Sequence, residues 1–213
     1  MKVLIYSDVH GNLPAFEKML KDEGPCDQYI CLDDLVNYGP WSNECVDLAL
    51  SLPNSTLLMG NHESAYIAGN YPGSNPLVQA FFNFTIGKFD RISAIGNFID
   101  SYPLGKYVCT HTLNDTYIYP DTNVTLDNNY IIGHSHHQFK YLNNNFTLYN
   151  AGSVGQNRKY INAANYLIYD TDTENMQMKY ILYDLNLLIS KIRSENYPEE
   201  CLNYYLSKET LTN

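Results

Sequence analysis

Short apolar runs alternate with stretches of helical periodicity along the first two-thirds of the chain. The runs at 2–7, 28–32 and 55–59 have the length of buried strands and end in turn residues. Between them, 13–24 and 43–52 place apolar residues at helical spacing, and 13–24 has a proline near its start and a glycine at its end. Strands that alternate with helices in this way predict an α/β fold with parallel strands and crossover helices.

The second half of the chain leans towards antiparallel β structure. Strand candidates lie at 106–110 and 130–132. The alternating arms of 139–150 and 165–181 predict two hairpins, the first of which turns at its asparagine run. A last amphipathic helix is expected at 185–193.

Residues 64–105 follow neither pattern. They contain an aromatic helical candidate at 77–89, flanked by glycine and proline, and we expect the whole segment to cap a pocket and to set substrate specificity. No linker, internal repeat or low-complexity stretch divides the chain. Because 213 residues fit a single core, we expect one domain spanning 1–213.

The composition narrows the class of protein and the kind of partner. With 45% hydrophobic and 17% charged residues, the chain is typical of a folded globular protein. A formal net charge of −10 argues against a nucleic-acid or anionic-membrane surface, because such surfaces depend on clustered Lys and Arg. No segment approaches the roughly 18 apolar residues of a membrane helix, and the apolar start is too short for a signal peptide. We therefore expect a cytoplasmic protein that has no membrane partner.

Five cysteines form an odd set without a Cys-x-x-Cys pair. This pattern argues against a secreted disulfide framework and against a zinc ribbon, so free thiols are expected.

Metal-binding residue types follow the predicted strands, at the point where each strand ends. They are Asp8, His10, Asp34, Asn61, His62, His111, His134 and His136. In open α/β sheets the carboxyl ends of the strands meet at one edge, where ligands bind. In extended backbone, residues two apart point to the same side, so His134 and His136 are expected to share a target, as are Asp8 and His10.

The chemistry of this set favours transition metals and a pair of ions. Carboxylate, imidazole and amide ligands without thiolate suit Mn, Fe, Co, Ni or Zn in five- or six-coordinate sites better than a structural tetrahedral zinc. Apart from His62, the neighbour of Asn61, these are seven candidate ligands. Seven are too many for one ion, whereas two ions that share one carboxylate would use them all. Phosphatases and nucleases have this two-metal arrangement, and phosphoester hydrolysis is therefore the leading chemistry.

Six sequence blocks resemble those of a known family. "DVHGN" (8–12), "DDLVNYGP" (33–40), "GNHE" (60–63), "THT" (110–112) and "GHSHH" (133–137) are similar, in order, to the five blocks of the calcineurin-like metallophosphoesterases. "NAGSVGQNR" (150–158) resembles a further block of a small bacterial and archaeal branch. The resemblance runs from residue 4 to about residue 158.

The resemblance implies a fold, a metal centre and a mechanism. The fold is an α/β, four-layer α/β/β/α sandwich of two mixed β-sheets flanked by helices. One metal is held by Asp8, His10, Asp34 and His136, and the other by Asp34, Asn61, His111 and His134. Manganese is the first expectation for both ions, with Fe, Ni, Co or Zn as alternatives. A hydroxide between the ions attacks phosphorus, Asp34 bridges the ions, and His62 protonates the leaving group or stabilises the transition state.

The sequence departs from the family pattern at three positions. Asp33 replaces the usual glycine before Asp34, and its charge either changes the metal preference or points away. Thr112 stands where glycine is common, and Ala151 where this branch often has proline.

Two further residues are candidate substrate contacts. The guanidinium of Arg158 matches the geometry of a phosphate and could bind it, although an exposed and merely solvated arginine is an equal alternative. Tyr38 either lines the substrate pocket or only packs against its neighbours.

The predicted activity is hydrolysis of a small-molecule or nucleotide phosphomonoester or phosphodiester. The resemblance leaves open a dinucleoside polyphosphate hydrolase and a protein serine/threonine phosphatase. A non-catalytic scaffold of the same fold, as in the retromer subunit that resembles these enzymes, usually lacks ligands, and none is missing here. The sequence does not indicate an oligomeric state.

Overall fold

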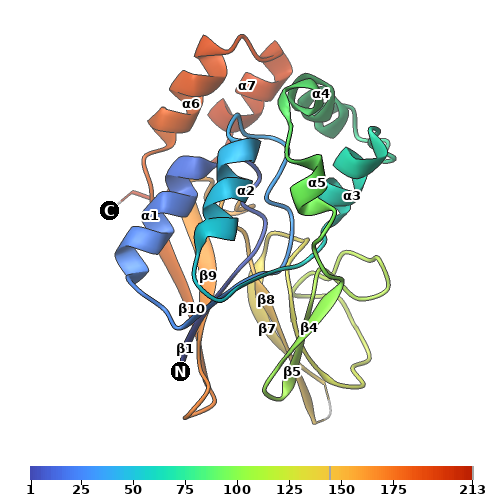
Figure 1. Ribbon diagram of the computed structural model, residues 1–213, viewed down its shortest axis with the longest axis vertical. Coiled ribbons are helices and arrows are strands. Elements are labelled where there is room, and N and C mark those ends of the chain that lie inside the picture. The colour runs from blue at the N-terminus through green and yellow to red at the C-terminus, as the bar shows by residue number, and fades with distance from the viewer. Residues whose placement is uncertain (144, 213) are drawn as a thin grey trace.

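Two mixed five-stranded sheets pack face to face in the computed structural model, which describes residues 1–143 and 145–212. The first sheet has the order β10-β9-β1-β2-β3, and the second has the order β4-β5-β6-β8-β7 (Figure 1). The strands of the first sheet are β1 (Lys2–Tyr6), β2 (Gln28–Cys31), β3 (Ser55–Leu57), β9 (Ala163–Asp170) and β10 (Asn175–Leu182). Those of the second are β4 (Ser101–Leu104), β5 (Tyr107–Thr110), β6 (Asn129–Ile132), β7 (Gln138–Asn143) and β8 (Phe146–Ala151).

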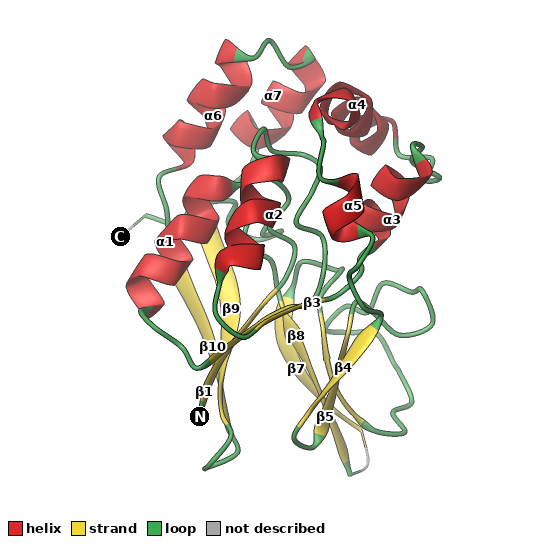
Figure 2. Ribbon diagram, viewed as in Figure 1, coloured by secondary structure: helices red, strands yellow, loops and turns green. Residues whose placement is uncertain are grey.

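The helices take two positions around this sandwich. They are α1 (Leu13–Glu23), α2 (Ser42–Ser51), α3 (Asn61–Ala68), α4 (Pro76–Thr85), α5 (Ile92–Ile95), α6 (Leu185–Ser194) and α7 (Glu199–Leu206), with a 3-10 turn at Ile86–Lys88. Figure 2 shows α1 and α2 beside the first sheet, whereas α3 to α7 gather at the end of the sandwich towards which β1 runs. The same end receives the loops that follow the parallel strands, so the helices enclose the space beyond the carboxyl ends of those strands.

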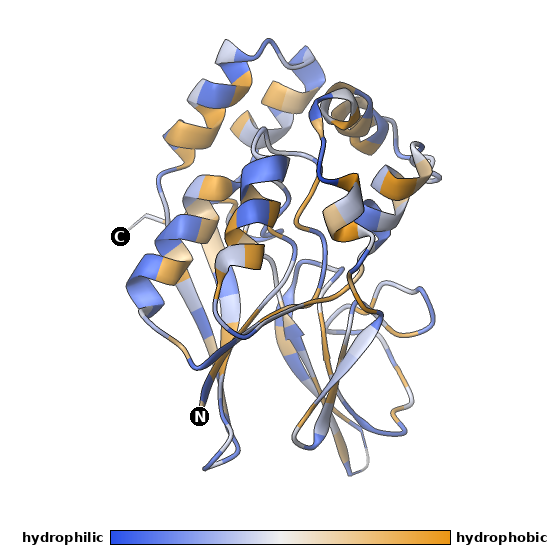
Figure 3. Ribbon diagram, viewed as in Figure 1, coloured by the Kyte–Doolittle hydropathy of each residue, from blue (hydrophilic) through white to orange (hydrophobic). Residues whose placement is uncertain are grey.

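Alternation along β1 explains how the first sheet is buried on both faces. Val3 and Ile5 point into the core between the two sheets, and Leu4 and Tyr6 point into the core beneath the helices; all four are fully buried. This is the period of two expected of a strand, with apolar residues at every position because both faces are covered. Figure 3 shows orange, the colour of hydrophobic residues, on the ribbon that runs upward from the N-terminus.

A loop covers the outer face of the second sheet. Ile118 and Leu126, from the segment 112–128, pack against Ile132, Phe139 and Leu148. This packing fixes the path of a segment without regular secondary structure directly after β5.

The predicted fold class is confirmed: two mixed sheets are flanked by helices. The predicted strands and helices are present, and the two predicted hairpins are β7–β8 and β9–β10. Asn144, which belongs to the predicted turn of the first hairpin, lies outside the described residues. Four elements were not predicted: α3, α5, β4 and α7. The second half is also less antiparallel than expected, because β5, β6 and β8 pair in parallel.

All five cysteines are free and buried, as expected. Within the described part of the chain, no helix is both long enough and apolar enough to cross a membrane.

Candidate metal centre

The loops after β1, β2, β3, β5 and β6 bring all seven predicted ligands to one place. Three sets of carboxylate and imidazole groups have ligand atoms within 4.8 Å of one another: Asp8 with His10 and His136, Asp34 with His111 and His134, and His10 with Asp34 and His62. Asn61, the first residue of α3, joins them through its Oδ1 atom, 2.9 Å from His111 Nε2.

The first group consists of Asp8, His10 and His136. The two Nε2 atoms lie 3.3 Å apart, and they are 3.5 Å and 2.9 Å from Asp8 Oδ1. Each imidazole donates its Nδ1 proton to a backbone carbonyl, that of Val36 or that of Gln156, at 3.0 Å. The Nε2 lone pairs therefore face each other without a proton between them, and the buried Asp8 Oδ1 accepts no hydrogen bond. Three converging, unprotonated donor atoms fit a cation.

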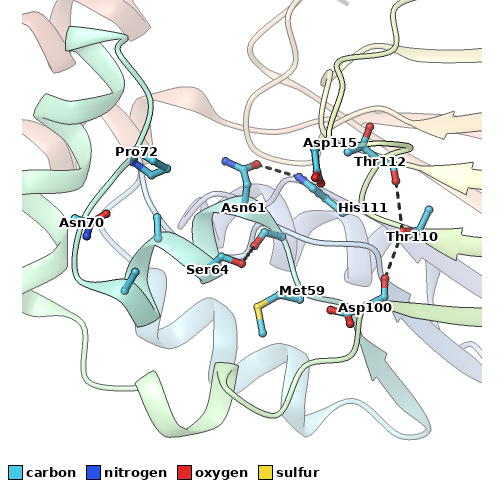
Figure 4. Close-up of a pocket in the computed structure, with 13 residues that line it drawn as sticks. Met59, Asn61, Ser64, Asn70, Pro72, Asp100, Thr110, His111, Thr112 and Asp115 are labelled. Carbon is cyan, nitrogen blue, oxygen red and sulfur yellow. Dashed lines mark hydrogen bonds between the residues drawn. The ribbon is translucent and has the colours of Figure 1, made fainter.

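The second group contains Asn61, His111 and His134. The Asn61 carbonyl oxygen faces His111 Nε2, as Figure 4 shows, and the rings of His111 and His134 lie 4.4 Å apart. Asp34 is within reach of both groups because its ligand atoms lie close to His111 and His134 and also to His10. Its Oδ1 atom additionally accepts the backbone N–H of His62 at 2.9 Å, which fixes the carboxylate between the two groups.

Asp33 holds His111 in place. Its fully buried carboxylate accepts the Nδ1 proton of His111, the backbone N–H of Asp8 at 3.0 Å and the hydroxyl of Ser7. The expectation that the Asp33 side chain points away from the metal-binding residues is therefore wrong. A carboxylate on Nδ1 fixes the tautomer that leaves Nε2 free for a metal and makes that nitrogen more basic. A Cβ at Gly133 would overlap Ser7 Oγ, so this arrangement needs glycine at the start of the "GHSHH" block.

The ligands are held in an unusual backbone conformation. Asp8, His10, Asp34, His134 and His136 have positive φ values of 53°, 50°, 42°, 67° and 59°. The argument from extended backbone is therefore wrong, because these residues lie in left-handed turns beyond the strands. Asp8 and His10 nevertheless share the first group as expected, whereas His134 and His136 join different groups. Left-handed backbone in non-glycine residues costs about 1–3 kcal/mol each and is typically retained at functional sites.

Glu63 ties the loop after β2 to the start of α3. Its carboxylate accepts the backbone N–H groups of Asp34, Leu35 and Val36 at 3.0, 2.7 and 3.3 Å, and that of Gly60 at 3.2 Å. It is buried and was not predicted as a functional residue, although it ends the "GNHE" block. Glu63 therefore fixes the position of Asp34 without reaching either group.

His62 is a neutral imidazole with its Nε2 proton available. Asn37 accepts the backbone N–H of Tyr38 at 2.8 Å through Oδ1, so its amide nitrogen faces His62 Nδ1 at 2.9 Å and donates to it. Burial, together with the neighbouring imidazole of His10, holds the pKa of His62 well below its usual value. His62 is therefore a hydrogen-bond donor through Nε2.

Burial sets the charge state of the other groups. It lowers the pKa of His134 to about 3 and that of His136 to about 4, so both rings are neutral ligands near neutral pH. Burial and the nearby Glu63 raise the pKa of Asp34 well above its usual value. Carboxyl oxygens of Asp8, Asp33 and Asp34 lie within 4.8 Å of one another, all buried, and a bound cation would offset their repulsion.

A cavity of about 310 Å³ opens over both groups. It is lined by Asp34, Tyr38, Asn61, His62, Tyr71, Asn75, Leu77, Val78, Tyr117, Tyr119, His134, His136, Arg158 and Tyr204. Both predicted substrate contacts, Tyr38 and Arg158, are among these residues. Tyr71, Tyr117, Tyr119 and Tyr204 were not predicted, and no spacing in the sequence links them to the metal-binding residue types.

Arg158 is held by the C-terminal helix. Its guanidinium donates to the hydroxyl of Tyr204 on α7 at 2.6 Å, and that hydroxyl donates to Gln156 Oε1 at 2.9 Å. Gln156 also supplies the carbonyl that accepts the Nδ1 proton of His136. One short network therefore joins Arg158, α7 and the first group.

A second cavity, of about 550 Å³, shares Asn61 as a lining residue with the first. Figure 4 shows the residues that line it. His111, Asp100 and Asp115 line it, together with residues of α3. Thr112 lines it too and donates its hydroxyl to the carbonyl of Thr116, so this replacement of a common glycine stabilises the loop after β5.

The sandwich and the metal-binding groups at its edge define a metallophosphoesterase. The chain belongs to the calcineurin-like phosphoesterase family, whose model matches residues 1–145. This confirms the resemblance, and the family binds divalent metals and acts on phosphoesters.

Individual relatives extend the match over nearly the whole chain. An uncharacterised protein of Methanocaldococcus jannaschii, MJ0912, is 29% identical over 236 residues, which cover 92% of this chain and 94% of the relative. The crystal structure of a metallophosphoesterase from Sphaerobacter thermophilus has a TM-score of 0.81 at 24% identity and covers 97% of this chain and 98% of its own. That of the hypothetical protein PH1004 from Pyrococcus horikoshii has a TM-score of 0.79 at 16% identity, with 96% and 97% covered. The two structures share the fold, including the C-terminal helices that lie beyond the family model.

Proposed function

We propose that this protein is a dinuclear metal-dependent phosphoesterase that hydrolyses phosphodiesters. One observation carries the proposal: two groups of converging carboxylate, imidazole and amide ligand atoms, most of them buried, lie next to Asp34 beneath a cavity that is lined by an arginine. Asp8, His10, Asp34 and His136 would hold one cation, and Asp34, Asn61, His111 and His134 the other. When bound, a pair of divalent cations lowers the pKa of water to near neutrality and offsets negative charge on the phosphoryl oxygens. Manganese remains the first expectation for both ions.

The chain's own residues position and stabilise the phosphoryl group. Arg158 faces the cavity and donates to Tyr204, a neutral hydroxyl, so its charge remains available to a phosphate. His62, neutral and protonated on Nε2, would donate a hydrogen bond to a phosphoryl or leaving-group oxygen. Of the two roles expected for His62, its lowered pKa favours stabilising the transition state over acting as an imidazolium acid.

Two cavities that share Asn61 as a lining residue favour a diester over a monoester. A diester carries two substituents on phosphorus, and each cavity has space for one of them. Helix α3 and the segment that follows it line both cavities, which supports the proposal that residues 64–105 form a cap that sets specificity. A dinucleoside polyphosphate carries several charges, yet Arg158 is the one Lys or Arg among the described residues that line either cavity.

Hydrolysis of bis(p-nitrophenyl) phosphate and of p-nitrophenyl phosphate tests this function. The protein is loaded in turn with Mn²⁺, Fe²⁺, Co²⁺, Ni²⁺ or Zn²⁺, and we expect turnover of the diester to exceed that of the monoester. Asp34→Asn should abolish turnover and lower the metal content, whereas His62→Ala should keep the metal and slow turnover by about 10²–10³-fold.

Asp172→Asn is the matched control, because Asp172 is 81% exposed in the turn between β9 and β10. It should retain both turnover and metal content. A protein that binds metal but cleaves neither ester would instead be a scaffold.

A further inference from the structure

Two tyrosine rings continue the cavity outward from His134. The Tyr117 ring lies flat on the His134 imidazole, with ring centroids 3.9 Å apart and planes 22° apart. Tyr119 is nearly parallel to Tyr117, at 12° and 6.1 Å. Tyr117 is 50% exposed and Tyr119 is 40% exposed, so neither ring is in the core. Both come from the loop that packs over the second sheet through Ile118.

A third ring lies over His62. Tyr71, in the segment between α3 and α4, stacks on that imidazole at 5.5 Å and 23°. It lines the same cavity as Tyr117 and Tyr119. Flat aromatic surfaces therefore lie next to a candidate metal ligand and also next to the residue proposed to contact the leaving group.

Few of the residues that line this cavity carry a charge. Apart from the candidate ligands and His62, Arg158 is the one residue charged near neutral pH among the described residues that line it. The aromatic residues line the cavity together with the uncharged Asn75, Leu77 and Val78. A substituent that binds to these aromatic surfaces has to be uncharged and flat. The phosphoryl group would instead contact Arg158 and the metal-binding groups.

We propose that Tyr117 and Tyr119, together with Tyr71, bind the base of a nucleoside phosphoester. This inference rests on the proposed function and narrows its substrate class. A base presents a planar π-face to an aromatic side chain, and such stacking contributes about 1–3 kcal/mol per base, or about 5- to 150-fold in affinity. A phosphoserine peptide has no ring at the corresponding position and gains nothing from this surface.

Competition between AMP and ribose 5-phosphate tests the inference, because the two ligands differ only by the base. Their inhibition constants are measured against bis(p-nitrophenyl) phosphate on the Mn²⁺-loaded protein. We expect AMP to bind at least about fivefold more tightly than ribose 5-phosphate. The second readout does not depend on turnover: AMP should perturb tyrosine fluorescence, and ribose 5-phosphate should not.

Variants locate the effect. Tyr117→Leu and Tyr119→Leu should each bring the two inhibition constants closer together, and Tyr117→Phe, which keeps the ring, should preserve their ratio. Metal content is measured in each variant, because Tyr117 also packs on His134. Tyr119 contacts the rings of Tyr117 and His137, so its replacement leaves the metal-binding groups untouched.

Two results would overturn the inference. One is equal affinity of the unaltered protein for AMP and ribose 5-phosphate. The other is a ratio that persists in Tyr119→Leu and Tyr117→Leu proteins that have full metal content. Either result leaves hydrolysis of the diester intact, so failure of the substrate class is distinguished from failure of the proposed function, in which no ester is cleaved.

Discussion

Replacing Asp33 by asparagine should weaken metal binding at the group that contains His111. The asparagine retains an oxygen that can accept from Ser7 and the backbone N–H of Asp8. Its amide nitrogen, however, would face His111 Nδ1 and donate to it. The imidazole proton then moves to Nε2, which removes the lone pair that a cation needs.

The size of the effect follows from the hydrogen bond that is lost. Loss of a carboxylate partner of a ligating histidine typically weakens metal affinity by 10- to 100-fold, which is about 1.4–2.8 kcal/mol. A hydrogen bond to a charged group contributes about 1.5–3 kcal/mol, in the same range. Removing the charge acts in the same direction, because Asp33 lies within 4.8 Å of Asp8 and Asp34 and attracts the same cations.

Calorimetric titration with Mn²⁺ resolves the two sites. We expect one dissociation constant to rise by 10- to 100-fold in Asp33→Asn and the other to change less. Asp33→Gly, which restores the residue common in the family, should show a similar loss because His111 again lacks its partner. The reasoning is refuted if both dissociation constants of Asp33→Asn stay within about twofold of the original protein while the variant remains folded.

Two further predictions concern the phosphate contact and the pH dependence of metal binding. Tyr204→Phe removes the hydroxyl that accepts from the Arg158 guanidinium, and it should lower kcat/KM by about tenfold, mainly through KM and with unchanged metal content. Tyr197→Phe is the control, because the Tyr197 hydroxyl has no hydrogen-bond partner among the described residues. Equal kinetics of the two variants would contradict the prediction. Burial and Glu63 raise the pKa of Asp34, and the Asp33 carboxylate raises that of His111 against the effect of burial. Both groups are therefore protonated at higher pH than is usual for their residue types, so Mn²⁺ binding should release protons and weaken as the pH falls. A binding enthalpy that is the same in buffers of different ionisation enthalpy would contradict this prediction.

Local periodicity predicted most of the fold, because buried strands and amphipathic helices leave a regular pattern. Strand β4 was not predicted, because it is short, mostly exposed and contains Pro103. The proline is tolerated because β4 is an edge strand. Helix α7 was not predicted either, because only a few of its residues, such as Cys201 and Tyr205, are buried and its apolar pattern is therefore weak. The parallel pairing of β5, β6 and β8 was missed because no regular helix joins these strands in the described chain.

The convergence of the candidate ligands could be predicted because parallel strands end at one edge, whatever conformation follows. The conformation itself was not predicted: Asp and His adopt left-handed backbone more often than most residues, but their presence alone does not mark where it occurs, as at Asp8 or His136. The roles of Asp33, Tyr117 and Tyr204 depend on contacts between segments far apart in the chain. Such contacts become visible only when the path of each loop is known.

The most direct measurement of the central claim is the electron paramagnetic resonance spectrum of the Mn²⁺-loaded protein, combined with its metal content. We predict two Mn²⁺ ions per chain with exchange coupling between them, and loss of that coupling in Asp34→Asn. A single ion per chain at saturation, or two ions without coupling, would contradict a centre in which Asp34 is shared.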